Sequence, residues 1–410
     1  MTRAPSGRVL FLSFDCPDPS QSGTSRTWDE LLMMRELGLH VTIITASAHY
    51  LTGDIPRPVR WLWRGDEADG TRFVRTWSPR AYRRSSALRL FTYLMYSSIS
   101  LLAGLFVRDV DVVLSATDPP FFTPSALLLS RLHRSRLVLD ERDVFPETAD
   151  ALGMSPSPLV SAVIAGWNKW LRGRANSVIT VSPGLKRLLL AAGAKADRIY
   201  IIPNYFASAE PRVQPMTRPS GSRFTVLYAG SLGQATHLAS ILDAARIVKD
   251  AGYADVCFRI LGAGERRAEY ETQAKALGLD NLEFGGVVPR SAMAGMYAQT
   301  DITVHSLPAH PYWRNAISTK VLEYLAHGKP VVFAGEGDIA DLLGKSQAGL
   351  VVTPQDGQAI ADAVMRLRDA PDLVADMSER AVRYIRVEYD RERMLETFRT
   401  ALGFGSIPEG

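Results

Sequence analysis

The sequence predicts an α/β protein of two Rossmann-like domains, each with a parallel sheet, that face each other across a cleft. Short apolar segments alternate with helical segments along the chain, and this alternation is typical of parallel sheets. The series stops at residues 204–223, a stretch rich in Pro, Ser and Ala that indicates a linker, and then restarts. The 410 residues are enough for two to three domains. Ligands of such sheets bind beyond the carboxyl ends of the strands, so the active site is expected in the cleft.

The first domain is expected to span residues 1–206 and the second residues 207–390, followed by a final segment at 391–410. Buried parallel strands read as nearly continuous apolar runs bounded by turn residues. In the first domain such runs lie at residues 9–14, 41–45, 73–76, 112–115, 137–140, 178–181 and 200–202. In the second domain they lie at residues 225–228, 257–261, 282–284, 302–305, 330–334 and 350–352.

Composition and motifs exclude several classes of protein. A hydrophobic content of 46% and a charged content of 22% are typical of a folded chain. The first residues show no apolar run followed by a cleavage site, so the protein is expected in the cytoplasm. The histidines show no ligand spacing and no GxxxxGK[ST] loop occurs, so neither a metal site nor a P-loop NTPase is expected.

The most informative segment is residues 301–335, which reads as a strand, a polar loop, a short helix and a second strand. The helix is expected at about residues 319–327, with Ser318 or Thr319 as its cap and Lys320 in its first turn. A helix that begins at the carboxyl end of a strand presents backbone amides and a positive dipole end. This arrangement suits an anion such as a diphosphate.

Glu323 lies one turn further along this expected helix. At that position its carboxylate can accept hydrogen bonds from the hydroxyls of a ribose. A sugar nucleotide combines both groups, a diphosphate beside a ribose. The same spacing also fits an ordinary helix–strand crossover with a surface glutamate, so spacing alone leaves both interpretations open.

Glycine-rich loops follow several expected strands. Gly23 precedes a helix that carries Arg26, and this loop either approaches a phosphate or is a glycine loop with a surface arginine. In the second domain, Gly230 and Gly233 lie between a strand and a helix in a phosphate-facing arrangement. The later pair Gly262 and Gly264 also follows a strand and can approach a nucleotide base, although GxG alone is a weak motif.

An acidic cluster follows the fifth expected strand of the first domain. Asp143 can orient or deprotonate the hydroxyl of an acceptor, with Arg142 beside it. Glu147 can act in the same way or can cap the next helix. Asp140 and Glu141 can instead form ion pairs with arginines.

Residues 88–107 form an apolar stretch within a strongly basic part of the chain. Seven arginines and no acidic residue occur between residues 70 and 108. Helical spacing places several apolar side chains partly on one side, with two tyrosines as candidates for a membrane interface: Leu90, Leu94, Ile99, Leu101 and Leu102, with Tyr93 and Tyr96. Three interpretations are open, namely a helix with a membrane-contacting face, a fully buried helix and a membrane-spanning helix. Binding to nucleic acid is not expected, because these arginines do not alternate with stacking aromatic residues.

These motifs together resemble those of family 4 glycosyltransferases, which have the GT-B fold. The similarity extends over nearly the whole chain through the motifs SGTSR, YAGSLG, IIPNYF and KVLEYLAHGKPVV. Within the family the chain is most similar to bacterial O-antigen and capsule enzymes of the N-acetyl-L-fucosamine transferase type. The shared features are the helix at residues 88–107 and the motifs RDVFPE and TKVLEY.

The resemblance implies a retaining, metal-independent glycosyltransferase that uses a nucleotide-sugar, expected to be UDP-linked, as its only co-substrate. Its acceptor would be a polyprenyl-diphosphate-linked glycan at the inner membrane face, contacted through residues 88–107. Its sugar would be an N-acetylated amino or deoxy sugar. The final segment is similar to the helix that in this fold crosses back to the first domain.

The resemblance also suggests site residues. Glu323 would hold the ribose and residues 318–320 the diphosphate. Gly23 and Arg26 would close on the leaving group. Asp143 and Arg142 would face the acceptor.

The chain departs from the family pattern at three positions. A second family glutamate, separated from Glu323 by seven intervening residues, is replaced by Asn315. The arginine and lysine frequent in the family's phosphate loop are replaced by Ser231 and Thr236. Cations for the diphosphate must therefore come from elsewhere, and the candidates are Lys320, Arg314 and Arg26.

Two other functions fit parts of the sequence. A sugar-nucleotide 2-epimerase shares the fold, but it has no need of an apolar helix such as residues 88–107. A catalytically silent scaffold of a polysaccharide assembly complex fits the departures from the family pattern. It would bind membranes without consuming a sugar donor.

Overall fold

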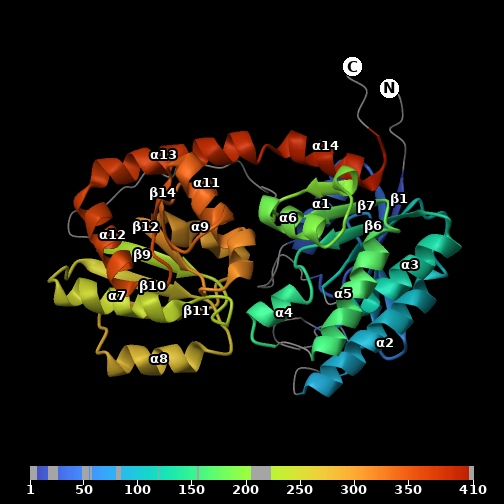
Figure 1. The fold of residues 1–410 in the computed structure, drawn as a ribbon, viewed down its shortest axis with the longest axis horizontal. Coiled ribbons are helices and arrows are strands. Elements are labelled where there is room, and N and C mark those ends of the chain that lie inside the picture. Colours follow the sequence, from blue (N-terminus) through green and yellow to red (C-terminus); the bar gives the residue numbers. More distant parts are fainter. Residues whose placement is uncertain are drawn as a thin grey trace. The chain divides into compact units, whose positions relative to one another are not determined.

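A computed structural model describes residues 7–16, 26–48, 55, 58–79, 85–118, 120–154, 157–204 and 223–405 (Figure 1). The chain forms two compact units. The first contains the described residues up to Asp150, from 157 to Pro203 and from Arg391 onward. The second contains residues 151–154 and the described residues from Asn204 to Asp390.

The first unit is built on an eight-stranded sheet with the order β3-β4-β2-β1-β5-β6-β7-β8. Its strands are β1 (Arg8–Leu12), β2 (His40–Ala46), β3 (Trp63–Ala68), β4 (Thr71–Thr76), β5 (Val112–Ala116), β6 (Arg136–Glu141), β7 (Ser177–Thr180) and β8 (Ile199–Ile201). All neighbouring strands of this sheet pair in parallel except β3 and β4, which are antiparallel.

Helices α1 (Arg26–Glu36), α2 (Ser86–Gly104), α3 (Thr123–Leu132), α4 (Glu147–Ala151), α5 (Pro158–Arg172) and α6 (Pro183–Ala191) follow the strands of this sheet, with 3-10 turns η2 (Pro120–Phe122) and η3 (Ala196–Arg198). Helix α14 (Arg391–Leu402) packs on β6, β7 and β8, and the Arg391 side chain forms an ion pair with Glu36 of α1. The last described helix of the chain thus contributes to the core of the first unit.

Helix α2, which covers the apolar segment expected at residues 88–107 except for its last three residues, is neither fully buried nor fully exposed. Tyr96 is buried and donates a hydrogen bond to the carbonyl of Ile44 at 2.8 Å, and Tyr93 packs edge-on against Phe14. The prediction that these two tyrosines lie at a membrane interface is therefore wrong, because they anchor α2 to the sheet. Four apolar side chains of α2 are 42–50% exposed, namely Leu90, Phe91, Leu94 and Leu102, and the polar Ser98 is exposed beside them.

A fully buried helix is therefore excluded at this position. Ile99, which the helical spacing grouped with Leu90 and Leu94, is only 2% exposed and faces the sheet. A search of the described part of the chain for helices with the length and apolarity of a membrane span found none.

The second unit contains a six-stranded parallel sheet with the order β11-β10-β9-β12-β13-β14. Its strands are β9 (Phe224–Ala229), β10 (Val256–Leu261), β11 (Leu282–Gly286), β12 (Ile302–Ser306), β13 (Val331–Ala334) and β14 (Gly349–Val352). Its helices are α7 (Leu238–Asp250), α8 (Arg267–Ala276), α9 (Arg290–Ala298), α10 (Thr319–Ala326), α11 (Asp338–Ser346), α12 (Gly357–Asp369) and α13 (Pro371–Glu388), with a 3-10 turn η4 (Pro311–Asn315).

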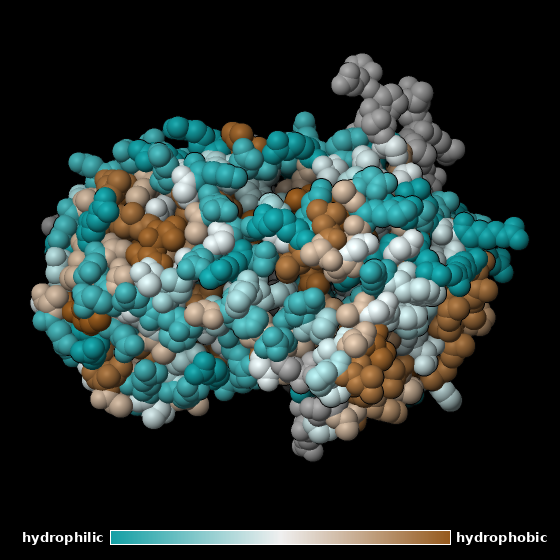
Figure 2. All heavy atoms as spheres, in the orientation of Figure 1, coloured by the Kyte–Doolittle hydropathy of each residue, from teal (hydrophilic) through white to brown (hydrophobic). Residues whose placement is uncertain are grey.

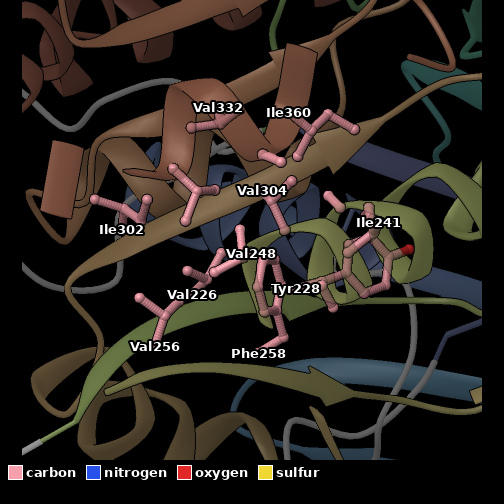
Figure 3. Packing of buried hydrophobic residues seen from close by; sticks show 14 of the residues in the cluster. Val226, Tyr228, Ile241, Val248, Val256, Phe258, Ile302, Val304, Val332 and Ile360 are labelled. Carbon is pink, nitrogen blue, oxygen red and sulfur yellow. The ribbon is translucent and has the colours of Figure 1, made fainter. Parts of the chain in front are cut away.

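Figure 3 shows how this sheet forms its core. Val226 and Tyr228 of β9, Phe258 of β10 and Val304 of β12 pack against Ile241 of α7. These side chains are all less than 1% exposed. A second cluster on the other side of the strands includes Leu227, Val331 and Phe333, packed against the apolar face of α10. Both faces of β9 are thus buried, which explains its continuous apolar sequence.

Every strand expected from the sequence is present, with ends that differ by about two residues at most. Strand β3 was not expected. Its sequence, WRGDEA, is polar and mostly exposed, as is usual for a charged strand at the edge of a sheet.

Candidate active site

In the second unit, one tyrosine of helix α10 forms hydrogen bonds with the carboxyl end of β9. The hydroxyl of Tyr324 accepts a hydrogen bond from the backbone amide of Ala229 at 2.9 Å and donates one to its carbonyl at 3.1 Å. Tyr324 is fully buried, and burial raises its pKa well above the ordinary value, so it remains a neutral donor and acceptor. The helix start and the loop after β9 are thereby held next to each other.

The side chain of Lys320 lies across Gly230, the first residue after β9. A Cβ atom built on Gly230 would lie only 1.7 Å from Cε of Lys320, so a larger residue would displace the lysine. The lysine Nζ is also 5.9 Å from the ring centroid of Tyr228. A positive charge is therefore positioned where the end of β9 and the first turn of α10 meet.

The first turn of α10 has no side-chain cap, although the amide of Val321 donates to the carbonyl of Ser318 at 3.1 Å. Ser318 is the N-cap residue, but its side chain makes no capping hydrogen bond. Ser318 therefore occupies the expected N-cap position, but without a capping hydrogen bond from its side chain. Ser318 and Thr319 are both partly exposed. Uncapped amides together with the positive end of the helix dipole favour an anion at this position.

Glu323 lies one turn along α10 from Lys320 and is also partly exposed. Its Oε2 accepts a hydrogen bond from the hydroxyl of Tyr297 at 3.4 Å. Tyr297 stacks on His327 with ring centroids 4.4 Å apart. A carboxylate oxygen accepts more than one hydrogen bond, so Glu323 can also bind a pair of hydroxyls.

The glycines of the second unit have different physical roles. Cβ atoms on Gly262 and Gly264 would lie 1.8 Å from the carbonyl oxygen of Gly230 and 2.3 Å from that of Leu232, so packing of the two loops requires both glycines. A Cβ atom on Gly233 would meet no atom within 4 Å. Protein packing therefore does not explain the glycine at Gly233, and close approach of a ligand remains an explanation.

Arg314 and Asn315 belong to η4, in the loop before α10. Arg314 forms an exposed ion pair with Glu336 at 2.7 Å. The Asn315 side chain donates to the carbonyls of Pro311 and Tyr312 at 3.3 and 3.4 Å. Asn315 thus stabilises its own turn, whereas the exposed pair of Arg314 can open at little cost in free energy.

The two positions where the family's phosphate-loop cations are replaced differ in exposure. Ser231 is exposed, whereas Thr236 is buried with its hydroxyl 3.0 Å from the hydroxyl of Tyr228. Lys320 thus places on this loop the positive charge that Ser231 and Thr236 do not carry.

In the first unit, Arg26 is buried and paired with protein groups. Its guanidinium donates to the carbonyls of Ile202 and Pro203 at 2.7 and 2.9 Å and to Asp140 at 3.1 Å, and its Nε lies 3.2 Å from Oε1 of Glu30. Only 4% of the side chain is exposed. The arginine therefore fixes the chain after β8 to the end of β6, and contact with a leaving group stays a prediction. Gly23 lies outside the described residues.

Arg142 joins the same buried network. It donates to Asp140 at 2.5 Å and to Thr27 and Glu30, both at 3.2 Å. Burial and the charge of Asp140 raise the pKa of Glu30 to about 8. Burial alone would raise the pKa of Asp140, but Arg142 and Arg26 together lower it below its ordinary value. At neutral pH this network therefore contains two arginines, an ionised Asp140 and a largely protonated Glu30.

Beside this network lie the residues expected to face an acceptor. Asp143 is partly exposed at the carboxyl end of β6, and Glu147 is exposed in the first turn of α4. As expected, Asp140 and Glu141 form ion pairs with arginines, and the partner of Glu141 is the buried Arg172 at 2.9 Å. Among the described residues, no group of three or more His, Cys, Asp or Glu side chains could hold a metal ion.

Some residues of the site were not expected from the sequence. The roles of Tyr324 and Tyr297 were hidden because the residues they contact lie 26 to 95 positions away in the chain. Asp118 in the first unit was also missed. It comes soon after an expected strand, and this position could have drawn attention to it.

Comparison with known proteins agrees with this architecture. Residues 23–205 match the family model of a glycosyl transferase 4-like domain, and residues 223–369 match that of glycosyl transferases group 1. The chain is 21% identical over 285 residues to the putative colanic acid biosynthesis glycosyl transferase WcaI of Escherichia coli (strain K12). This match covers 65% of the chain and 68% of that relative.

Solved structures show the same fold. A sucrose-phosphate synthase from Thermosynechococcus elongatus superposes with a TM-score of 0.73 at 15% identity, covering 95% of this chain and 96% of the other. Anabaena Alr3699/HepE, in complex with UDP and glucose, superposes with a TM-score of 0.67 at 16% identity, covering 96% and 98%. The two parallel-sheet units and the two matched family models together identify the chain as a glycosyltransferase of the GT-B fold that belongs to the group 1, family 4-like enzymes.

Proposed function

We propose that this glycosyltransferase moves an N-acetylated amino or deoxy sugar from a UDP-sugar to a polyprenyl-diphosphate-linked glycan in cell-surface polysaccharide assembly. The transfer retains the configuration of the donor and needs no metal ion. The subgroup resemblance to transferases of the N-acetyl-L-fucosamine type supports this class of sugar. The names of two similar proteins, a colanic acid biosynthesis transferase and a UDP-bound enzyme, are consistent with polysaccharide assembly and with the nucleotide.

The observation that supports a donor diphosphate most directly is the position of Lys320. Its side chain lies across Gly230, beside the uncapped first turn of α10. A diphosphate there would meet an ammonium group, backbone amides and a helix dipole at once. These fixed charges and dipoles can stabilise the leaving UDP without a metal ion, because they are oriented before the reaction begins.

The position of Glu323 supports a nucleoside attached to this diphosphate. Its carboxylate is partly exposed one turn beyond Lys320, and it already accepts a hydrogen bond from Tyr297. A ribose offers two adjacent hydroxyl donors to a carboxylate. In this proposal Glu323 therefore binds the ribose while the start of α10 binds the diphosphate.

A lipid-linked acceptor and a peripheral membrane contact are supported by the surface of the first unit. Leu102, Leu128 and Leu132 are 45–63% exposed on α2 and α3, and Arg108 and Arg131 are exposed nearby. Figure 2 shows brown areas on the part of the surface formed by α2, α3 and α5. Apolar side chains flanked by arginines suit the surface of an anionic leaflet.

The test is transfer by the full chain. The assay follows UDP release from a panel of UDP-sugars, in the presence of EDTA, with N-acetylglucosaminyl-diphospho-undecaprenol as the acceptor. We expect release with at least one donor and an α-linked product from an α-linked donor. Lys320→Met should lower kcat by about 100-fold through loss of charge stabilisation on the leaving group.

Lys275→Met is the matched control for this variant. Lys275 is an exposed lysine of α8 in the same unit, so its loss should leave kcat unchanged. Equal effects of the two substitutions would rule out the assigned role of Lys320. Binding to membranes without any donor turnover would favour the scaffold function instead.

A further inference from the structure

Asp118 is an unusual carboxyl group in the first unit. It lies in the short connection between β5 and η2. Both carboxyl oxygens are shielded from solvent, and neither has a hydrogen-bond partner. Among the carboxylates in the described part of the chain, no other has both oxygens buried without a partner.

The neighbours of Asp118 explain why it has no partner. The charged groups that act on it are Asp143, Arg142, Asp140 and Glu141. Arg142 is the only cation of this set, and it donates instead to Asp140, Glu30 and Thr27. Burial and then the charge of Asp143 raise the pKa of Asp118 well above its ordinary value, which favours the neutral carboxyl group.

A neutral carboxyl group without a partner is unfavourable in a folded protein, because folding removes it from water without replacing the lost hydrogen bonds. Such a group calls for an explanation, and a ligand that completes its hydrogen bonds is one. In sheets of this kind ligands bind beyond the carboxyl ends of the strands, which is where Asp118 lies beside Asp143.

We propose that Asp118 binds a hydroxyl group of the acceptor sugar and thereby positions the acceptor beside Asp143. The neutral carboxyl donates one hydrogen bond and accepts another, and a sugar hydroxyl likewise does both. This inference rests on the proposed function only for the identity of the ligand. The missing hydrogen-bond partner is a property of the protein itself.

The first arm of the test needs no ligand. Thermal unfolding of the full chain is compared at pH 6 and pH 8 for Asp118→Asn and Asp118→Ala, with Asp197→Asn as the control. Asp197 is an exposed acid in the turn before β8. We expect both Asp118 variants to be more stable than the wild type, by several degrees at pH 8 and by less at pH 6. A loss of stability in Asp118→Asn would overturn the proposal, because it would show that the carboxyl has a partner within the protein.

The second arm measures binding of a water-soluble acceptor, citronellyl-diphospho-N-acetylglucosamine, by calorimetry without a donor. Asp118→Ala should weaken this binding by about 10-fold or more, since it removes both hydrogen bonds to the hydroxyl. Asp118→Asn should stay within about threefold of the wild type, because its amide also donates and accepts hydrogen bonds. Binding of UDP should not change in either variant.

These outcomes separate the proposal from the proposed function. Equal binding of this acceptor by the wild type and Asp118→Ala overturns the role of Asp118, and so does its failure to bind the wild type. An equally large loss in Asp118→Asn would also overturn it, because that result requires an ionised carboxylate. Absence of sugar transfer in a protein whose acceptor binding depends on Asp118 would contradict the proposed function alone.

Discussion

Glu323 is the residue whose role is easiest to test alone. If its carboxylate binds the ribose, each hydrogen bond to this charged group contributes about 1.5–3 kcal/mol. Glu323→Ala should therefore raise the KM for the donor by roughly 10- to 100-fold. Circular dichroism should show an unchanged fold, because the side chain lies outside the buried face of α10. Wild-type turnover in this variant would contradict the assignment.

The glycines allow a paired test of packing against ligand binding. Gly233→Ala meets no protein atom, so it should leave the thermal stability unchanged while weakening donor binding. Gly262→Ala would press a methyl group onto the carbonyl of Gly230, and Gly262 also has a φ of 133°. It should destabilise the unit by about 1–3 kcal/mol. Chemical unfolding and donor titration of both variants would measure these effects, and a stable Gly262→Ala would show that the loops can separate.

The buried network of the first unit predicts how stability depends on pH. The pKa of Glu30 is about 8 in the folded protein and near 4.5 when exposed. The folded state therefore holds a proton that the unfolded chain has lost between these values. The free energy of unfolding should fall as pH rises through this window, by up to about 1.4 kcal/mol per pH unit for one proton. Glu30→Gln should reduce this slope in urea unfolding measured from pH 5 to pH 8.

The opposite hypothesis, an ionised Glu30, predicts a different dependence on pH. If Glu30 is ionised throughout, Glu30→Gln should destabilise the protein equally at every pH, because Arg142 and Arg26 would lose a charged partner. Asp197→Asn, the exposed control, should follow the wild type in either case.

Residue patterns predicted some site residues better than others. Lys320 and Glu323 lie on one short helix, so their spacing placed them together. The contacts of Arg26 with the carbonyls of Ile202 and Pro203 were not expected, and its role near a leaving group stays a prediction. Contacts between residues so far apart in the sequence depend on the tertiary fold, which local spacing does not encode.

At the scale of elements, the exposed face of α2 allows a direct test of the proposed membrane contact. Leu94 is 50% exposed on this helix, whereas Leu190 is 38% exposed on α6. Burial of a leucine side chain in a membrane contributes about 1.5–3 kcal/mol. Leu94→Glu should therefore reduce cosedimentation with phosphatidylglycerol vesicles by about 10-fold or more.

Leu190→Glu is the matched control and should bind vesicles like the wild type. High salt should weaken binding in all three proteins, because the arginines act through the surface potential. Equal loss in the two variants, or no binding by the wild type, would remove α2 as the membrane contact.

The sequence predicted helices and strands best where burial determines which residues are apolar. The central strands β9 and β12 are buried on both faces, so each reads as an apolar run bounded by polar residues. Strand β3 is a charged edge strand that pairs with β4 through backbone hydrogen bonds. Its mostly exposed side chains show no apolar run, so the sequence pattern did not predict it. The N-cap residue of α10 is Ser318, as expected, but its side chain makes no capping hydrogen bond, which residue type alone does not reveal.

At the scale of the whole molecule, the two units carry different chemistry. The second unit combines Lys320, the start of α10 and Glu323 into a proposed site for a nucleotide. The first unit combines Asp118, Asp143 and an apolar outer surface into a proposed site for a sugar attached to a lipid. A transferase needs both kinds of site, and in this proposal the fold supplies one in each unit.

The most direct test of the donor site is thermal stabilisation of the full chain by UDP-, GDP- and dTDP-sugars in the presence of EDTA. We expect UDP-sugars alone to raise Tm, since a ligand at 100 times its Kd stabilises by about 2.7 kcal/mol. The shift should disappear in Lys320→Met and persist in Lys275→Met. No shift with any UDP-sugar, or an equal shift in Lys320→Met, would contradict the central claim that Lys320 and the start of α10 bind the donor diphosphate.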